Sequence, residues 1–233
     1  LESGSAAVNF GWQGGEPTLM GLDFFRRAVQ LQQQLGFQGQ QVANGLQTNG
    51  LLLDVEWAAF FGEFQFLIGL SIDGPAHVHD HYRRTRGDGD SYSRVIQSLR
   101  LLRKAGVHAN ALSVVNDYSV RFPDEIYDFH KSEGMRWMQF IPCVEPDPAD
   151  PTRAASFSVP PRAYGEFLCR LFDRWMADFR GGVPKTSIRW FDSLFYGYVG
   201  QPAPECTLMA ECGVYVVVEH NGDVYSCDFF VEP

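Results

Sequence analysis

AAVNFGWQGGEPTLMGLDFFRRAVQLQQQLG (residues 6–36) is the stretch that decides the fold. Residues 6–12 are mostly small or apolar and predict a short buried strand. The next residues form a glycine-rich turn, Gln13-Gly14-Gly15-Glu16-Pro17. Residues 21–36 then predict a helix, because apolar side chains recur near a period of 3.6, at Leu22, Phe25, Ala28, Val29 and Leu31.

The same alternation continues along the chain. We expect strands at 66–73, 107–115 and 137–144, a strand end at 45–50, and helices at 91–106, 122–134, 160–182 and after the capping residue Asp54. Strand–helix alternation with short links favours a parallel sheet with helical crossovers. Roughly five units are visible, fewer than a full TIM barrel needs. We therefore predict an α/β fold in which a partial TIM-type (β/α) barrel, lacking its first unit, occupies residues 1–182.

The composition is that of a soluble globular protein and argues against two classes of partner. Hydrophobic residues are 45%, charged residues 20%, and the formal net charge is −9. Phosphate binding needs a basic surface, so we expect no nucleic acid. No apolar run reaches about eighteen residues, the length that indicates a membrane span. The first residues also lack the regions of a signal peptide, and we expect a cytoplasmic protein.

Unusual turn sequences follow the predicted strands at 13–17, 47–50, 71–75 and 143–146. Parallel sheets bind ligands at the carboxyl ends of their strands, so these turns predict a single site. Gly14 and Gly15 would let backbone groups approach a ligand without interference from a Cβ atom. The carboxylate of Glu16 would accept hydrogen bonds from an ammonium group. A plain strand–helix turn is the alternative.

Residues 183–233 predict a second module, rich in cysteine. Two short predicted strands, residues 214–219 and 223–226, flank Asn221-Gly222, which indicates a hairpin. An odd number of cysteines without a secretion signal favours metal or cluster binding over disulfides. A hairpin would bring the flanking Cys212 and Cys227 close together, and Cys206 lies six positions before Cys212. Thiolates gathered in this way bind Zn²⁺ or an iron–sulfur cluster. Buried unpaired cysteines are the alternative.

Other candidate ligands carry less weight. His77, His79 and His81 alternate in a segment after a strand, which favours a solvated loop over a metal site. Cys143 ends a strand, and Cys169 lies within an apolar helix pattern. We expect both thiols to be packed in the interior.

In combination, these segments resemble the anaerobic sulfatase-maturating enzymes, a radical S-adenosylmethionine (SAM) family with a C-terminal SPASM cluster domain. The likeness spans nearly the whole chain. GGEP and C-x9-G-x4-C (residues 212–227) are shared with other SPASM maturases, whereas QTNG, LSIDGP and YSCDFFV point to the sulfatase maturases. FGWQGGEPTLMGLDFF, GLSIDGPAHVHDHYRR, MQFIPCVEP and VEHNGDVYSCDFFV follow one another in the family's order.

The resemblance implies a role for individual residues. The GGE segment would meet the amino group of SAM, two polar residues would contact the same cofactor, and one residue would lie by its adenosine. These are, in turn, Gly14, Gly15 and Glu16; Ser71 and Arg83; and Val144. Gln13 would face the substrate peptide.

The resemblance also assigns the cysteine-rich module. Cys206, Cys212 and Cys227 match the first ligands of an auxiliary [4Fe–4S] cluster, and Asp228 matches a general base. A neighbouring cluster thiolate would raise the pKa of Asp228 and strengthen it as a base. A structural cap at the end of the hairpin is the alternative role.

The implied activity is the oxidation of a Cys or Ser of a sulfatase polypeptide to Cα-formylglycine through a 5′-deoxyadenosyl radical. It would use SAM, [4Fe–4S] clusters and an electron donor such as ferredoxin or flavodoxin. The family's C-x3-C-x2-C loop and later SPASM cysteines do not occur in the sequence. We therefore expect a fragment of a longer protein that does not cleave SAM by itself.

Two alternatives remain open. One is a different SPASM radical SAM peptide maturase, for example one that forms thioether crosslinks. The other is a non-catalytic Zn²⁺-binding module, in which His220 would supply the fourth ligand beside the three cysteines.

Overall fold

The computed structural model describes residues 5–213 and 215–231. The chain divides into two compact units, Leu1–Ile188 and Arg189–Pro233. Residues Ser187–Ile188 form a strand that pairs with the sheet of the first unit. The division therefore follows Ile188, later than the predicted limit at residue 182.

The first unit is built on a six-stranded sheet in which every neighbouring pair is parallel. The strand order follows the sequence without reversal, so right-handed crossovers place the helices on one face, as in a (β/α) barrel. Within the described residues the two outer strands do not pair with each other, so the sheet is an open, partial barrel. The predicted α/β fold is confirmed. The strands are β1 (Ala7–Trp12), β2 (Gln41–Thr48), β3 (Leu67–Ser71), β4 (Ala109–Val115), β5 (Trp137–Pro142) and β8 (Ser187–Ile188).

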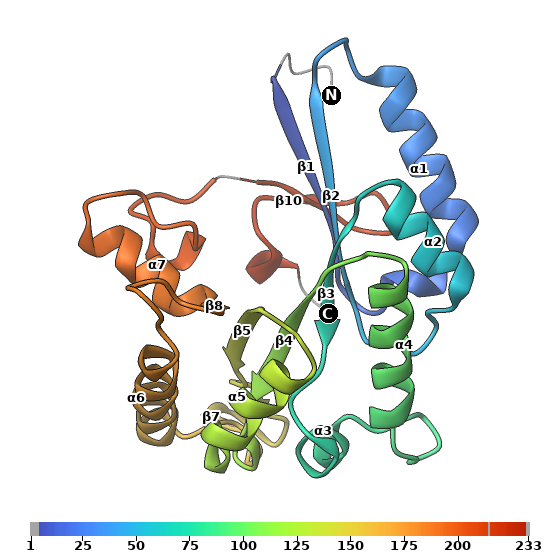
Figure 1. Ribbon diagram of the computed structural model, residues 1–233. Helices are drawn as coiled ribbons and strands as arrows, with labels where there is room; N and C mark the ends of the chain where they lie inside the picture. Colours follow the sequence, from blue (N-terminus) through green and yellow to red (C-terminus); the bar gives the residue numbers. More distant parts are fainter. Residues whose placement is uncertain (1–4, 214, 232–233) are drawn as a thin grey trace. The chain divides into compact units, whose positions relative to one another are not determined.

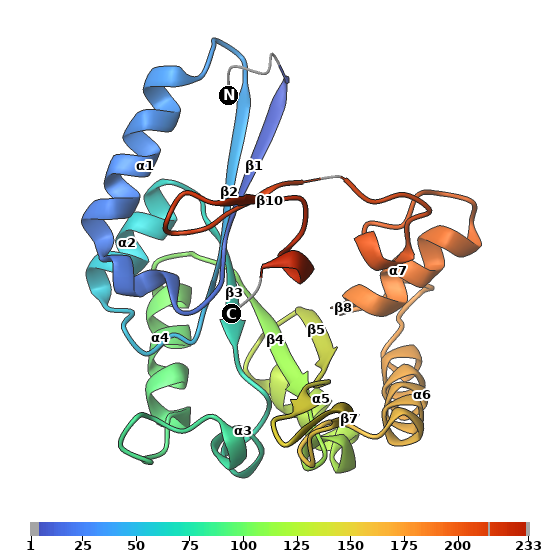
Figure 2. The same ribbon diagram turned by 180° about the vertical axis from the view of Figure 1, so that it is seen from behind.

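The helices of this unit connect successive strands of the sheet along the chain (Figures 1 and 2). They are α1 (Leu22–Leu35), α2 (Val55–Glu63), α3 (Ala76–Tyr82), α4 (Tyr92–Lys104), α5 (Pro123–Ser132) and α6 (Pro161–Ala177). In both views α1, α2 and α4 lie on the same side of the sheet. Two elements differ from the prediction: α6 ends at Ala177, earlier than expected, and α3 occupies the segment predicted as a loop. A small antiparallel pair, β6 (Pro146–Asp147) and β7 (Asp150–Ala154), follows β5.

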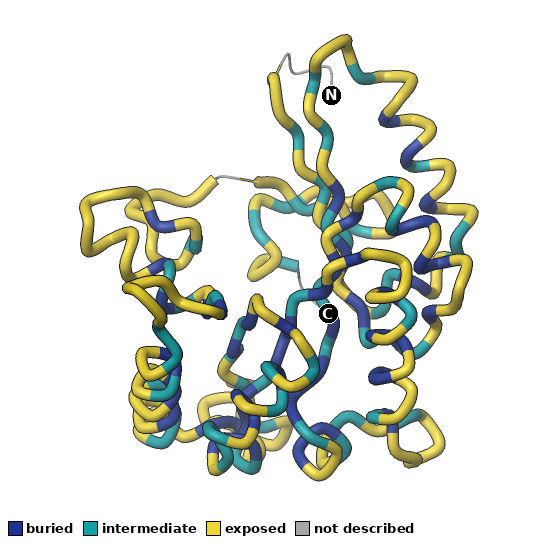
Figure 3. The backbone as a smooth tube through the Cα atoms, viewed as in Figure 1, coloured by how far each residue is buried: buried dark blue, intermediate teal, exposed yellow. Residues whose placement is uncertain are grey.

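The core lies between the sheet and these helices (Figure 3). Phe25 of α1 and Phe61 of α2 are fully buried, and the ring of Trp57 packs edge-on against Phe25, with centroids 5.5 Å apart. Asp54 caps α2 as predicted, because its carboxylate accepts from two backbone N–H groups of the first turn. These contacts hold the strands that carry the candidate site.

The second unit contains α7 (Arg189–Tyr198) and a short antiparallel hairpin of β9 (Val217–Val218) and β10 (Val224–Tyr225). Gly222, in the turn, has a φ of 90°, which glycine adopts without strain. The predicted hairpin is confirmed for the residues described. Val214, at the start of the predicted strand, lies outside them. No helix in the described part of the chain has the length and apolar character needed to cross a membrane.

Candidate functional site

Most of the predicted SAM-binding residues lie where strands of the sheet end. Gly14, Gly15 and Glu16 follow β1, Ser71 is the last residue of β3, and Val144 follows β5. Carboxyl ends of parallel strands meet at one edge of a sheet. Because β2 and β3 pair in register, with Thr48 beside Leu70, the turn after β2 adjoins the end of β3. The structure thus brings these segments to one edge, which we call the carboxyl edge.

The turn after β1 has the open backbone that the sequence predicts. Gly14 and Gly15 have φ values of 82° and 48°, a region that residues with a Cβ atom rarely adopt. A Cβ atom built on either glycine would meet no heavy atom within 4 Å. The peptide groups of this turn are therefore uncovered, and the turn fits a ligand that approaches the backbone closely.

The carboxylate of Glu16 fastens this turn to the neighbouring strand. Oε1 accepts from the backbone N–H of Thr18 (3.1 Å), from its hydroxyl (2.6 Å) and from the hydroxyl of Thr48 (2.7 Å). Oε2 accepts from the N–H of Asn49 (2.8 Å). Each carboxylate oxygen has about two lone-pair sites, so Oε1 is fully used by its three donors, whereas Oε2, with one donor, can accept a further hydrogen bond. In this structure Glu16 positions the glycines, and Oε2 has room for one further donor such as an ammonium group.

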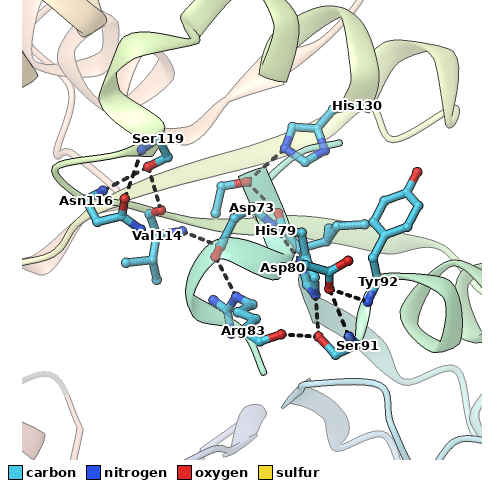
Figure 4. A network of polar contacts seen from close by, with 12 residues as sticks. Asp73, His79, Asp80, Arg83, Ser91, Tyr92, Val114, Asn116, Ser119 and His130 are labelled. Carbon is cyan, nitrogen blue, oxygen red and sulfur yellow. Dashed lines mark hydrogen bonds and ion pairs between the residues drawn. The ribbon is translucent and has the colours of Figure 1, made fainter. Parts of the chain in front are cut away.

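Arg83 forms the second polar contact at the carboxyl edge (Figure 4). Its Nε donates to Oδ2 of Asp73 at 2.7 Å, and Oδ1 of Asp73 accepts from the N–H of Val114 at 2.8 Å. Asp73 lies two residues beyond Ser71 and is only 3% exposed. This contact joins the ends of β3 and β4 to the residue that caps α3. A guanidinium fixed in this way is suited to binding a carboxylate.

The segment with three histidines corrects the prediction of a solvated loop. His79 lies in α3 and is 1% exposed, and burial lowers its pKa to about 4. Its Nδ1 lies 3.3 Å from the backbone nitrogen of Asp73, and its Nε2 lies 3.0 Å from Oγ of Ser91. His77 contacts Glu125, and His81 stacks on the ring of Tyr118. The helical spacing separates the three rings. Helix α3 was not predicted from the sequence because the segment is short and polar.

The other predicted residues of this unit have fewer contacts. Gln13 and Val144 are exposed, the latter by 68%. Cys143 is half-buried, and burial is the main cause of its raised pKa. Cys169 is exposed, so its predicted place in the core is wrong. The buried face of α6 carries Phe167, Leu171 and Trp175, and Cys169 lies on another face.

In the second unit, Asp228 is close to Cys227 and Tyr215. The hydroxyl of Tyr215 donates to Oδ1 of Asp228 at 2.6 Å, and Sγ of Cys227 lies 3.2 Å from the same oxygen. The hydrogen bond from Tyr215 is the largest cause of a lowered pKa at Asp228. This is the pKa of Asp228 beside the thiol of Cys227, and the rise expected beside a cluster thiolate stays a prediction.

The three predicted cluster ligands lie apart. Cys206 begins a short 3₁₀ helix, Cys212 is exposed, and Cys227 precedes Asp228. Among the described residues, no group of three or more His, Cys, Asp and Glu side chains is placed to hold a metal ion. His220, the fourth ligand of the zinc alternative, has a side chain that is 86% exposed. The described residues do not form a complete ligand set for an auxiliary cluster or for zinc, and we derive no step through either group.

Sequence reasoning missed the residues that position the candidate ligands. Asp73, Thr48 and Asn49 all fall in the segments predicted as unusual turns, but no role was predicted for any of them. The available signal was a polar residue directly after a buried strand, as with Asp73 after Ile72.

Comparison with known proteins identifies the family. The model of the radical SAM superfamily matches residues 3–128. A serine-type anaerobic sulfatase-maturating enzyme of Bacteroides thetaiotaomicron is 40% identical over 97% of this chain and 57% of its own length. A cysteine-type enzyme of Clostridium novyi is 38% identical over 95% of this chain and 59% of its own.

A solved structure gives the same result. Native anSMEcpe with bound AdoMet and Cp18Cys peptide superposes with a TM-score of 0.91 at 35% identity, over 99% of this chain and 63% of that one. The chain spans somewhat over half the length of the curated relatives, 57% and 59% for these two. The predicted resemblance is confirmed. The chain belongs to the radical SAM superfamily, and along nearly its whole length it is similar to anaerobic sulfatase-maturating enzymes.

Proposed function

We propose that this protein takes part in sulfatase maturation, oxidising a Cys or Ser side chain of a sulfatase to Cα-formylglycine. The observation that carries the proposal is the superposition, over 99% of the chain, on a relative solved with both AdoMet and a peptide. The uncovered glycine turn and the fixed Arg83 at the carboxyl edge support it from this chain's own geometry.

Bound SAM would supply the 5′-deoxyadenosyl radical, and the protein would hold the target close and exclude water. At the carboxyl edge the backbone of Gly14 and Gly15, held by Glu16, would receive the amino group of SAM. Ser71 and Arg83 would bind its carboxylate end, and Val144 would lie by its adenosine. Gln13, which is exposed beside the glycine turn, would face the peptide.

Asp228 would act as the general base. The target side chain must lose a hydrogen atom from Cβ, a proton and one further electron to reach the oxidised level. The 5′-deoxyadenosyl radical would take the hydrogen atom, Asp228 the proton, and a one-electron acceptor of the full-length protein the electron. Asp228 is ionised near neutral pH, so its carboxylate can accept the proton from the target's thiol or hydroxyl, but its lowered pKa makes it a weaker base than the raised pKa expected beside a cluster thiolate would. The hydroxyl of Tyr215, which donates a hydrogen bond to Oδ1 of Asp228, would hold the carboxylate in position.

The proposed partners are a sulfatase polypeptide and an electron donor such as ferredoxin or flavodoxin. The assignment of Cys206, Cys212 and Cys227 to an auxiliary [4Fe–4S] cluster stays a prediction. A cytoplasmic location is part of the proposal, because exposed unpaired cysteines such as Cys212 suit a reducing compartment.

The direct test uses the full-length protein, purified without oxygen and reconstituted with iron and sulfide. It is incubated with SAM, a reductant and two sulfatase-motif peptides that differ only in carrying Cys or Ser. We expect 5′-deoxyadenosine and an aldehyde-containing peptide from at least one of them. Formation of neither product would refute the proposed function.

A further inference from the structure

Arg83 is held at three points in the network of Figure 4. Its backbone N–H donates to the carbonyl of His79 at 3.1 Å, and its own carbonyl accepts from the hydroxyl of Ser91. Its side chain is held by Asp73 through Nε. Both the backbone and the side chain of Arg83 are therefore fixed before any ligand binds.

The donors of this network determine the tautomer of His79. The backbone N–H of Asp73 points to Nδ1, so Nδ1 must be the acceptor. The hydroxyl of Ser91 gives its only hydrogen to the carbonyl of Arg83, so it must accept from Nε2 of His79. His79 is thus neutral, with its proton on Nε2, which agrees with its lowered pKa of about 4. One chain of hydrogen bonds connects Asp73, His79, Ser91 and Arg83.

The orientation of the guanidinium follows from Asp73. Both oxygens of this buried carboxylate are engaged, one by the N–H of Val114 and one by Nε of Arg83. In the described part of the chain, the two terminal nitrogens of Arg83 make no hydrogen bond, and its side chain is 26% exposed. Two free, parallel N–H groups of one guanidinium match the two oxygens of a carboxylate.

We propose that Asp73 is a positioning residue, which turns Arg83 so that its two terminal nitrogens bind the carboxylate of SAM. Ser91 and His79 hold the backbone of Arg83 in support. This inference rests on the proposed function, because it takes SAM to be the ligand of the carboxyl edge. The competing explanation is that Arg83 only neutralises a buried charge and contacts no ligand.

The two explanations predict different binding for a ligand that lacks the carboxylate of SAM. We would measure equilibrium binding of SAM and of decarboxylated SAM to the anaerobically purified holoprotein. The wild type should prefer SAM by about tenfold or more, the value of a charge-assisted pair. Asp73→Asn should weaken SAM binding about tenfold but change binding of decarboxylated SAM by less than about twofold. In an Arg83→Ala background, Asp73→Asn should have no further effect.

The matched control is Asp124→Asn, which removes a carboxylate that pairs with Arg170 and Arg174 between α5 and α6. This variant should keep the wild-type preference, and its loss there would overturn the proposal. Equal weakening of both ligands by Asp73→Asn would show a structural role only and would also overturn it, as would unchanged binding of SAM. If the wild type binds neither ligand, the proposed function itself fails.

A second variant serves if circular dichroism shows that Asp73→Asn does not fold. Ser91→Ala releases the carbonyl of Arg83 without leaving a charge unpaired. It should reduce the preference for SAM by about two- to fivefold, as expected for one neutral hydrogen bond. An unchanged preference in this variant would contradict the proposal.

Discussion

The carboxyl edge of the sheet and the cysteine hairpin both carry residues that the family resemblance assigns, but they are held in different ways. At the edge, hydrogen bonds join segments far apart in sequence, such as Glu16 to Asn49 and Asp73 to Val114. In the hairpin, the bonds of Asp228 come from Tyr215 and Cys227, within one short stretch. At the edge, polar groups that join strands, such as Thr48 and Asp73, are buried, whereas Cys212 and the hairpin tip are exposed.

This difference shows which chemistry the described chain already provides. Buried, fully paired polar groups are rigid and can fix a ligand group in advance. The edge therefore has the character of a preformed binding site. The hairpin offers a carboxylate with a lowered pKa but no gathered set of thiols.

The largest effect should come from the hairpin. Asp228→Asn removes the proposed base, and we expect formation of the aldehyde peptide to fall by about 10²- to 10⁴-fold. Formation of 5′-deoxyadenosine should fall much less, because cleavage of SAM does not use this carboxylate. Both products are measured by mass spectrometry, with Asp223→Asn in the same hairpin as control. A parallel fall of both products would assign Asp228 a structural role.

The next effect tests the rigidity of the edge. Glu16→Gln replaces one acceptor oxygen by an amide that faces N–H and O–H donors. We expect the free energy of unfolding to fall by about 2–3 kcal/mol, since the lost bonds are charge-assisted. Urea denaturation measures it, with the exposed Glu63→Gln as control. Equal stability of the two variants would show that the edge is not held by Glu16.

A smaller effect is expected on the pH dependence of stability, which depends on two buried histidines of the unit that carries the carboxyl edge. His79 and His130 are buried in the first unit, and their pKa values are lowered to about 4 and about 3, mainly by burial. The unfolded chain binds their protons more tightly, so their contribution to stability is complete above about pH 6.5 and is lost as pH falls toward 4. From pH 7 to pH 5 each should lower the unfolding free energy by about 1–2 kcal/mol.

Urea denaturation at the two pH values measures this loss. His130→Leu removes one of the two titrating groups and should reduce the pH dependence by roughly half. Ser113, the partner of His130, keeps its bond to the carbonyl of Ile72 in that variant. A variant with the full wild-type pH dependence would show that His130 does not contribute.

The smallest effect is expected at Cys169. Because this thiol is exposed on α6, Cys169→Ser should change the unfolding free energy by less than about 0.5 kcal/mol. Thermal denaturation measures it. A fall of several kcal/mol in the unfolding free energy would indicate that Cys169 is packed in the core, as the sequence predicted.

Periodicity was enough to predict the helices, because apolar residues such as Phe25 and Val29 repeat at helical spacing. The alternation of these helices with short apolar strands was then enough to predict a parallel sheet. Asn221-Gly222 was enough for the hairpin. Helix α3 was not predictable, since it is short, begins after Pro75 and contains polar residues throughout most of its length. Cys169 was misplaced because apolar residues such as Phe172 also occur on the exposed side of α6.

The residues of the candidate site could be predicted, but the contacts between them could not. The resemblance named Arg83 and Glu16, whereas their partners Asp73, Thr48 and Asn49 depend on which strands lie side by side. Strand order and the helix between Asp73 and Arg83 bring these groups together, and no local pattern encodes that geometry. The hydrogen bond from Tyr215 that lowers the pKa of Asp228 was likewise not predictable from the sequence.

The most direct test of the account compares one variant from each region for binding of SAM alone. Arg83→Ala alters the carboxyl edge, and Cys227→Ser alters the hairpin while leaving the edge intact. We predict that the dissociation constant of SAM rises by about tenfold or more in the first variant and stays within about twofold of wild type in the second. Equal weakening in both variants, or weakening only in Cys227→Ser, would contradict the claim that the carboxyl edge is the SAM site.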